Sequence, residues 1–199
     1  MASGTENGHG SRFSISTRQI VAAGIIGGIA LFLGATRIGF IPVPIPLIGN
    51  ATIMHLPAIV GGALEGPVVG ILAGAIFGIF SILNADSPLF LNPVIAVVPR
   101  LLIGVVAWAV FVSLRRLSVD LASAVSGVLG SLTNTVGVVG LAVLFGLLPP
   151  EAIPIIVPQA IAEAVLAAVV TVVVVRGVLL YRSGRTTAPE IGSDEEKRY

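Results

Sequence analysis

Few side chains in the long apolar stretches of this sequence are able to do chemistry, and they are well separated along the chain. Arg100, Glu163 and His55 are ionisable, and Asn134 and Gln159 carry amide groups that form hydrogen bonds. Gln159 precedes Glu163 by four residues, so both lie on one face if their segment is helical. Ionisable groups are costly inside a membrane, and each therefore marks a candidate functional site.

The types of these residues favour a small ligand with a negatively charged group. Arg100 supplies a positive charge, and two further amides, Asn50 and Asn92, precede predicted helices that begin on the same side of the membrane. The amino-terminal end of a helix carries a partial positive charge and attracts anions. We therefore predict a binding site for a carboxylate or similar anion, with substrate contacts from Asn50, His55, Asn92, Arg100, Asn134, Gln159 and Glu163.

Four of these residues also have a purely structural interpretation. Arg100 and Glu163 can neutralise each other as a buried ion pair between two helices. Asn134 is as well suited to bond a neighbouring helix as to contact a ligand, and His55 can be a core histidine. The residue types alone leave these alternatives open.

The composition excludes several classes of site. The chain has no cysteine, two histidines and a single lysine, Lys197, so it can build neither a cysteine or multi-histidine metal centre nor a P-loop ATPase. Its net charge of +1 argues against nucleic acid as a partner. We predict no metal, no cofactor and no enzymatic activity. An intramembrane enzyme with Glu163 and His55 as acid and base remains an alternative.

The hydropathy of the chain places most of it in lipid. Its 199 residues are 55% apolar and only 11% charged, less than half the usual charged share, and the mean hydropathy is +1.05. Proline, glycine and charged residues divide the apolar part into segments. We predict an all-α integral membrane protein, a bundle of six transmembrane helices over residues 19–36, 51–64, 67–83, 93–112, 121–148 and 153–181.

The distribution of arginine gives these helices an orientation. Pairs of arginines precede the first helix, separate the fourth from the fifth and follow the sixth, so all fall on one side of a six-span protein. By the positive-inside rule this side is the cytoplasm. We predict a multi-pass cell-membrane protein with a cytoplasmic tail 1–17, a substrate-binding domain 18–182 and a disordered cytoplasmic tail 183–199.

The second predicted helix is short, and an irregular segment precedes it. About 14 residues reach about 21 Å, less than the roughly 30 Å of the hydrocarbon layer. Residues 41–46 contain three prolines, which exclude a regular helix. This loop between the first and second helices is either a rigid external connection or a lid over a binding pocket.

A stripe of small residues follows one face of the first predicted helix. Ala23, Gly27, Ala30 and Gly34 are spaced so that they share this face. Small side chains let two helices approach closely in lipid. The stripe serves either packing inside the bundle or docking of a second membrane protein.

Two segments carry a resemblance to a known family. The first, 51–70, contains Ala51-Thr-Ile-Met-His-Leu-Pro, and the second runs from Asn92-Pro93 to Pro99-Arg100-Leu-Leu-Ile-Gly. They resemble helices of the substrate-capture subunits, or S components, of energy-coupling factor (ECF) vitamin transporters, which are prokaryotic membrane proteins. The likeness extends over about 19–181 and agrees with six helices and two cytoplasmic ends.

The resemblance implies a subunit that captures a water-soluble vitamin from outside, under a lid between helices 1 and 2. Its partners would be a transmembrane coupling subunit, two ABC-type ATPase subunits and the bilayer. The family docks through small residues on helix 1, which implies the stripe Ala23, Gly27, Ala30 and Gly34. Because the predicted site favours an anion, pantothenate is the first candidate among the vitamins. A stand-alone carrier is the second alternative.

Overall fold

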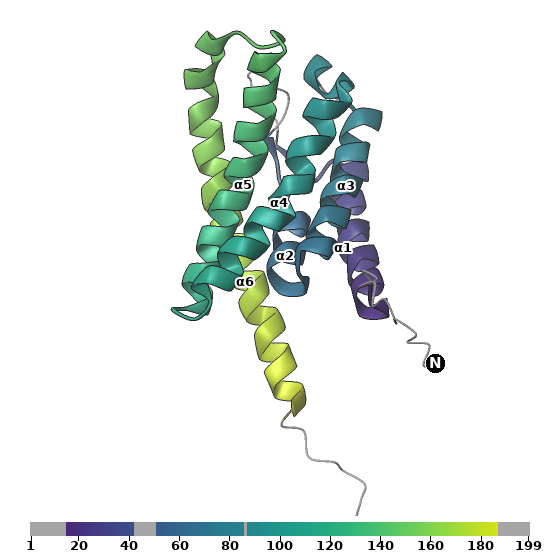
Figure 1. Ribbon diagram of the computed structural model, residues 1–199, viewed down its shortest axis with the longest axis vertical. Coiled ribbons are helices and arrows are strands. Elements are labelled where there is room, and N and C mark those ends of the chain that lie inside the picture. The colour runs from purple at the N-terminus through teal and green to yellow at the C-terminus, as the bar shows by residue number, and fades with distance from the viewer. Residues whose placement is uncertain (1–14, 42–50, 86, 187–199) are drawn as a thin grey trace, which may run out of the picture.

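The chain folds into a bundle of α-helices, seen in a computed structural model that describes residues 15–41, 51–85 and 87–186 (Figure 1). The predicted all-α class is confirmed, with one two-stranded ribbon and two short 3-10 helices added to it. In chain order the elements are α1 (Thr17–Ala35), β1 (Phe40–Ile41), β2 (Ala51–Thr52), α2 (Leu56–Glu65), α3 (Pro67–Leu83), η1 (Pro88–Leu91), α4 (Pro93–Leu114), α5 (Val119–Leu144), η2 (Pro150–Ala152) and α6 (Ile153–Thr186).

The helices have the lengths and the surface of a membrane protein. In the described part of the chain, α1, α4, α5 and α6 are long and apolar enough to cross a membrane, whereas α3 has 17 residues and α2 has 10. At 1.5 Å per residue α2 covers about 15 Å, half of a hydrocarbon layer. Large apolar side chains face outward, among them Phe32, Val136 and Leu180, which are 60%, 67% and 71% exposed. Such a surface is suited to lipid.

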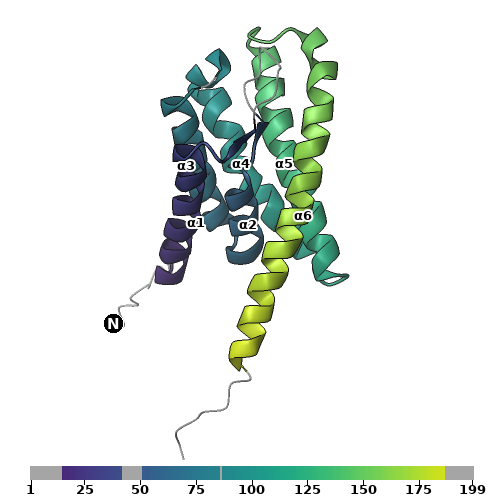
Figure 2. The same cartoon turned by 180° about the vertical axis from the view of Figure 1, so that it is seen from behind.

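The short helix α2 occupies the centre of the bundle. It packs against α1, α3, α4, α5 and α6, and both views show these helices around it (Figures 1 and 2). Ile59 of α2 is fully buried in a core cluster with Met54, Phe77 and Ile103. Because α2 is enclosed by protein, its amino-terminal end need not reach a face of the lipid layer.

Glycines allow α2, α3 and α4 to approach each other closely. A Cβ atom added to Gly62 of α2 would lie 2.2 Å from the carbonyl oxygen of Gly104 in α4. One added to Gly104 would lie 2.3 Å from Cα of Gly70 in α3. The three backbones therefore touch where no side chain fits between them.

Local sequence explains where several helices begin. Ser16 caps α1 in a capping box with Gln19, and Ser118 caps α5. Asn92 caps α4, whose first residue is Pro93. Proline at the first helical position loses no hydrogen bond. Capping residues and prolines are visible in the sequence, so these helix starts could be predicted from it.

The second helix begins at Leu56 and not at residue 51, which corrects the prediction. Ala51 and Thr52 form β2, which pairs antiparallel with Phe40 and Ile41 of β1. Because Ala51 and Thr52 are held in this strand pairing, their backbone N–H and C=O groups do not form the hydrogen bonds of a helix. Most of the predicted lid, residues 42–50, and with it Asn50, lies outside the described residues.

The last two helices also differ from their predicted bounds. α5 ends at Leu144 rather than 148, and Gly146 follows with a φ of +68°. α6 continues to Thr186, so the first residues of the predicted tail 183–199 are helical. Residues 1–14 and 187–199 of the two predicted tails lie outside the described residues.

The small-residue stripe of α1 faces the inside of the bundle. Ala23, Gly27, Ala30 and Gly34 are all buried. A Cβ atom on Gly34 would lie 2.6 Å from the ring of Phe80 in α3. The stripe is thus used for packing against α3 rather than presented for docking, which corrects its assignment to a partner interface.

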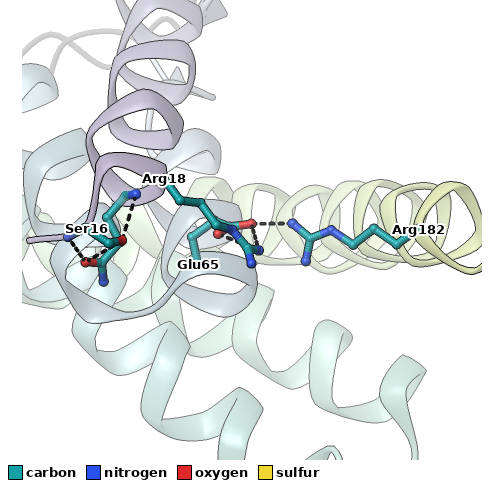
Figure 3. Close-up of polar contacts among 5 residues, drawn as sticks. Ser16, Arg18, Glu65 and Arg182 are labelled. Atoms are coloured by element: carbon teal, nitrogen blue, oxygen red, sulfur yellow. Dashed lines mark hydrogen bonds and ion pairs between the residues drawn. The ribbon is translucent and has the colours of Figure 1, made fainter. Parts of the chain in front are cut away.

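An ionic cluster ties three helices together at the end of the bundle that carries the start of α1 and the end of α6. Glu65, the last residue of α2, accepts hydrogen bonds from Arg18 of α1 and Arg182 of α6 (Figure 3). Nη2 of Arg18 lies 3.0 Å from Oε2 of Glu65. Gly66 follows with a φ of +100°, a conformation suited to glycine, and lets the chain turn directly into α3.

Candidate functional site

A small polar cavity lies among β2, η1, α4, α5 and α6. Its space for water-sized molecules is about 40 Å³. Four of the seven predicted site residues line it, namely Arg100, Asn134, Gln159 and Glu163. The other lining residues are Thr52, Phe90, Thr135, Val138, Val139, Ile156 and Ala160.

Glu163 is held by the strand that follows the predicted lid segment and by its own helix. Its Oε1 atom accepts a hydrogen bond of 3.0 Å from the backbone N–H of Thr52 in β2. The same oxygen accepts one of 3.2 Å from Nε2 of Gln159, one turn earlier in α6. Glu163 is 8% exposed, so these donors stabilise a carboxylate that is largely withdrawn from water.

Arg100 is held in α4 by a carbonyl group and two aromatic rings. Its Nη1 atom donates a hydrogen bond of 2.7 Å to the carbonyl oxygen of Ile95. Its guanidinium lies 5.0 Å from the ring centre of Phe77 and 4.7 Å from that of Phe90. Cation–π contacts and burial to 2% exposure fix the charge in position.

A proline explains why the Ile95 carbonyl is available to Arg100. In a regular helix the N–H of residue 99 would donate to the carbonyl of residue 95. Pro99 has no N–H, so it leaves this carbonyl without its helical donor. The adjacent sequence Pro99-Arg100 therefore both frees the acceptor and supplies the side chain that uses it.

Two amide oxygens in the cavity wall have unused hydrogen-bonding capacity. Oδ1 of Asn134 and Oε1 of Gln159 are buried and have no hydrogen-bond partner among the described residues. Leaving such an atom without a donor costs free energy, so each calls for an explanation. Donor groups of a bound ligand would satisfy both oxygens.

The remaining predicted site residues do not line this cavity. His55 precedes α2, is 1% exposed, and lies near the Thr52 backbone and the charge of Arg100. Asn92 caps α4, and its Oδ1 accepts a hydrogen bond of 3.0 Å from the N–H of Val94. The third, Asn50, lies outside the described residues.

Sequence reasoning missed the other seven lining residues, and three of them show why. The N–H of Thr52 is free to bond Glu163 because Thr52 belongs to a strand, whereas the sequence predicted a helix there. Phe90 belongs to the unpredicted 3-10 helix η1. Thr135 is next to Asn134 in the sequence, and this adjacency was a usable signal.

The arrangement suits binding rather than acid–base chemistry. The fixed charge of Arg100 is matched to an anion, and the two amide oxygens are matched to hydroxyl or amide donors. Glu163 lines the cavity but His55 does not, so the pair required by the enzyme alternative does not face one shared space. Within the described residues, no group of three or more metal-ligating side chains gathers.

Comparison with known proteins agrees with this picture. The family model described as "ECF transporter, substrate-specific component" matches residues 18–175, which include every described residue of the cavity. No curated protein matches the chain. The match covers most of the chain, and the sequence resemblance is confirmed. This protein therefore belongs to the family of substrate-specific components of ECF transporters.

Proposed function

We propose that the cavity beside Arg100 binds a small molecule with a carboxylate group, and that pantothenate is the first vitamin to test. The observation that carries this proposal is the fixed position of Arg100, which contacts two aromatic rings and donates a hydrogen bond to the Ile95 carbonyl. An arginine held in this way is preorganised for a carboxylate, because little side-chain entropy is lost on binding.

The other cavity residues are matched to the remaining groups of such a ligand. Asn134 and Gln159 accept hydrogen bonds from its hydroxyl or amide groups through their unused oxygens. Glu163 keeps its bond to Gln159 and accepts a donor from the ligand in place of the Thr52 N–H. Pantothenate carries a carboxylate, an amide and hydroxyl groups, so it offers one partner for each of these side chains.

Binding of a whole vitamin requires movement of the cavity walls. A volume of about 40 Å³ holds a few waters, whereas pockets for small organic ligands measure roughly 300–1,000 Å³. The hydrogen bond from Thr52 to Glu163 connects the cavity to the end of the predicted lid segment. We expect ligand entry to exchange this bond for ligand contacts.

The partners of this subunit are a transmembrane coupling subunit and two ABC-type ATPase subunits. Because the stripe from Ala23 to Gly34 is buried, we place the docking surface on the exposed face of α1 that lies beside this stripe. Gly24 and Gly28 lie on that face, and neither has another atom within 4 Å of an added Cβ. A helix of the partner subunit could therefore approach the backbone of α1 closely at these two glycines.

The orientation that fits this role has both termini in the cytoplasm of a prokaryotic cell. Arg18, Arg182 and the α4–α5 connection with Arg115 and Arg116 lie at the same end of the bundle, which supports the positive-inside assignment (Figure 1). The loaded subunit then docks through α1 and releases its ligand inward when the partner ATPases hydrolyse ATP.

Direct binding to the purified chain tests the proposal. Isothermal titration with pantothenate and with its neutral amide should give tight binding of the acid and at least tenfold weaker binding of the amide. Equal binding of both would overturn the role of Arg100. Turnover of the ligand by the purified chain would favour the enzyme alternative, and uptake into vesicles that contain this chain alone would favour the carrier.

A separate test addresses docking. The double substitution Gly24→Leu and Gly28→Leu should prevent co-purification with the coupling subunit and leave ligand affinity unchanged. Gly177→Leu is the matched control, because Gly177 in α6 also has no atom near an added Cβ. Retained assembly of the double variant would contradict the proposed docking face.

A further inference from the structure

An apolar groove lies directly beside the polar cavity, between α5 and α6. Its volume is about 380 Å³. Side chains such as Leu132, Val136, Val157 and Ile161 line it, and Thr135 is the one polar residue in its wall. Val136, Val157 and Ile161 are 67%, 46% and 58% exposed, so the groove opens on the lipid-facing surface.

The groove and the cavity share a wall. Thr135, Val139, Ile156 and Ala160 line both spaces. Two of these residues come from α5 and two from α6, so the wall is the seam between the two helices. The side chains of Val139 and Ile156 are the bulkiest of this wall, which separates the polar space from the apolar one.

The polar cavity and the apolar groove differ in volume and in lining, so a ligand that fills both must have two different parts. The cavity of about 40 Å³ accommodates a group the size of a carboxylate, which Arg100 would bind. The neighbouring groove is about 380 Å³, and its lining offers almost no hydrogen-bonding group. A ligand that fills both therefore has a small charged head and an apolar chain.

We infer that this protein binds amphipathic carboxylic acids, with the carboxylate at Arg100 and the apolar chain laid across the α5–α6 seam into the groove. The inference rests on the proposed function, because the same cavity holds the carboxylate. It adds the substrate class: among acids, those with an apolar chain bind more tightly than those that are polar throughout. Pantothenate is then the hydrophilic comparison.

Chain length tests the inference in the purified protein. We would titrate butanoate, octanoate and pantothenate into the wild type in detergent micelles, with a micelle blank for each acid. Each buried methylene contributes a factor of about four in affinity. Octanoate should therefore bind at least about tenfold more tightly than butanoate and more tightly than pantothenate. Equal affinities for octanoate and butanoate would overturn the inference.

A groove-filling variant locates the chain. Gly140 lines the groove but not the cavity, and an added Cβ there meets no atom within 4 Å, so Gly140→Leu can fill the groove without strain. Once shown to be folded, Gly140→Leu should weaken octanoate binding about tenfold and leave butanoate binding unchanged. Gly177→Leu, an equally open position of α6 outside the groove, should change neither.

The outcomes separate this inference from the proposed function. If octanoate binding is unaffected by Gly140→Leu, the groove holds only lipid chains and the inference is wrong. If Arg100→Met abolishes binding of every acid while chain length has no effect, the proposed function stands and the inference falls. If no carboxylate binds the wild type, the proposed function itself fails.

Discussion

Nη1 of Arg100 donates a hydrogen bond of 2.7 Å to the carbonyl oxygen of Ile95, five residues earlier in the same helix. A side chain that bonds back to its own helix is held close to the helix axis. The bond is possible because Pro99 withholds the usual backbone donor. The position of the charge in the cavity thus depends on the residue that precedes it.

Substitution of this proline should loosen Arg100. Pro99→Ala restores an N–H that competes for the Ile95 carbonyl, so the guanidinium loses part of its anchor. We expect carboxylate affinity to fall about fivefold, less than on removal of Arg100 itself, while the helix gains a backbone hydrogen bond. Titration calorimetry and thermal unfolding measure the two effects. Unchanged affinity in a folded variant would show that the proline has no part in positioning Arg100.

Glu163 should matter for stability as the acceptor of the Thr52 N–H. Glu163→Gln keeps an oxygen for this bond, whereas Glu163→Leu leaves the partly buried N–H of Thr52 without its partner. The leucine variant should lose about 1–3 kcal/mol in the free energy of unfolding, and the glutamine variant less than about 1 kcal/mol. Unfolding in detergent, followed by circular dichroism, compares them. Equal stability of the two variants would mean that the bond contributes nothing.

The glycine contact between α3 and α4 should tolerate no side chain. Gly104→Ala places Cβ 2.3 Å from backbone atoms of Gly70, which can only be relieved by separating the helices. We expect a loss of at least about 2 kcal/mol. Gly28→Ala, at an open position of α1, should instead be neutral or stabilise by up to about 1 kcal/mol. Similar unfolding temperatures for the two variants would contradict the close approach.

The Glu65 cluster should hold α1 and α6 to the end of α2. Glu65→Gln removes the charge shared by Arg18 and Arg182, and we expect a loss of about 1 kcal/mol that shrinks at high salt. Arg18→Ala should cost less, because Arg18 is 69% exposed and Arg182 still bonds Glu65. Arg116→Ala at the exposed α4–α5 turn is the control. A cost no larger for Glu65→Gln than for this control would exclude a clamping role.

Patterns local in the sequence predicted the helices well. Pro67 and the pair Asn92-Pro93 mark the observed starts of α3 and α4, because capping and proline geometry act over a few residues. The convergence of Arg100, Asn134, Gln159 and Glu163 could also be predicted, since depth counting placed Arg100 and Glu163 in the outer half of their spans and Asn134 near the middle of its own. The same counting placed His55 with them, although it does not line the cavity.

Features that depend on distant segments were not predictable in the same way. The start of α2 was misplaced because Ala51 and Thr52 pair with residues 40 and 41, and no local pattern shows this pairing. Which face of α1 is buried in the bundle could not be predicted either, because small residues suit packing against a neighbouring helix and docking of a partner subunit alike. The side chains of Ile76 beside Gly27 and Phe80 beside Gly34 decide the matter.

The small molecules that co-purify with the protein from the membrane show whether the cavity beside Arg100 holds a carboxylate. The purified wild type and the Arg100→Met variant, both shown to be folded, would be denatured and the released compounds identified by mass spectrometry. We predict a carboxylate-bearing compound at close to one per wild-type chain and at least about a tenfold lower amount in the variant. Equal occupancy of both proteins, or a neutral compound in the wild type, would contradict the account.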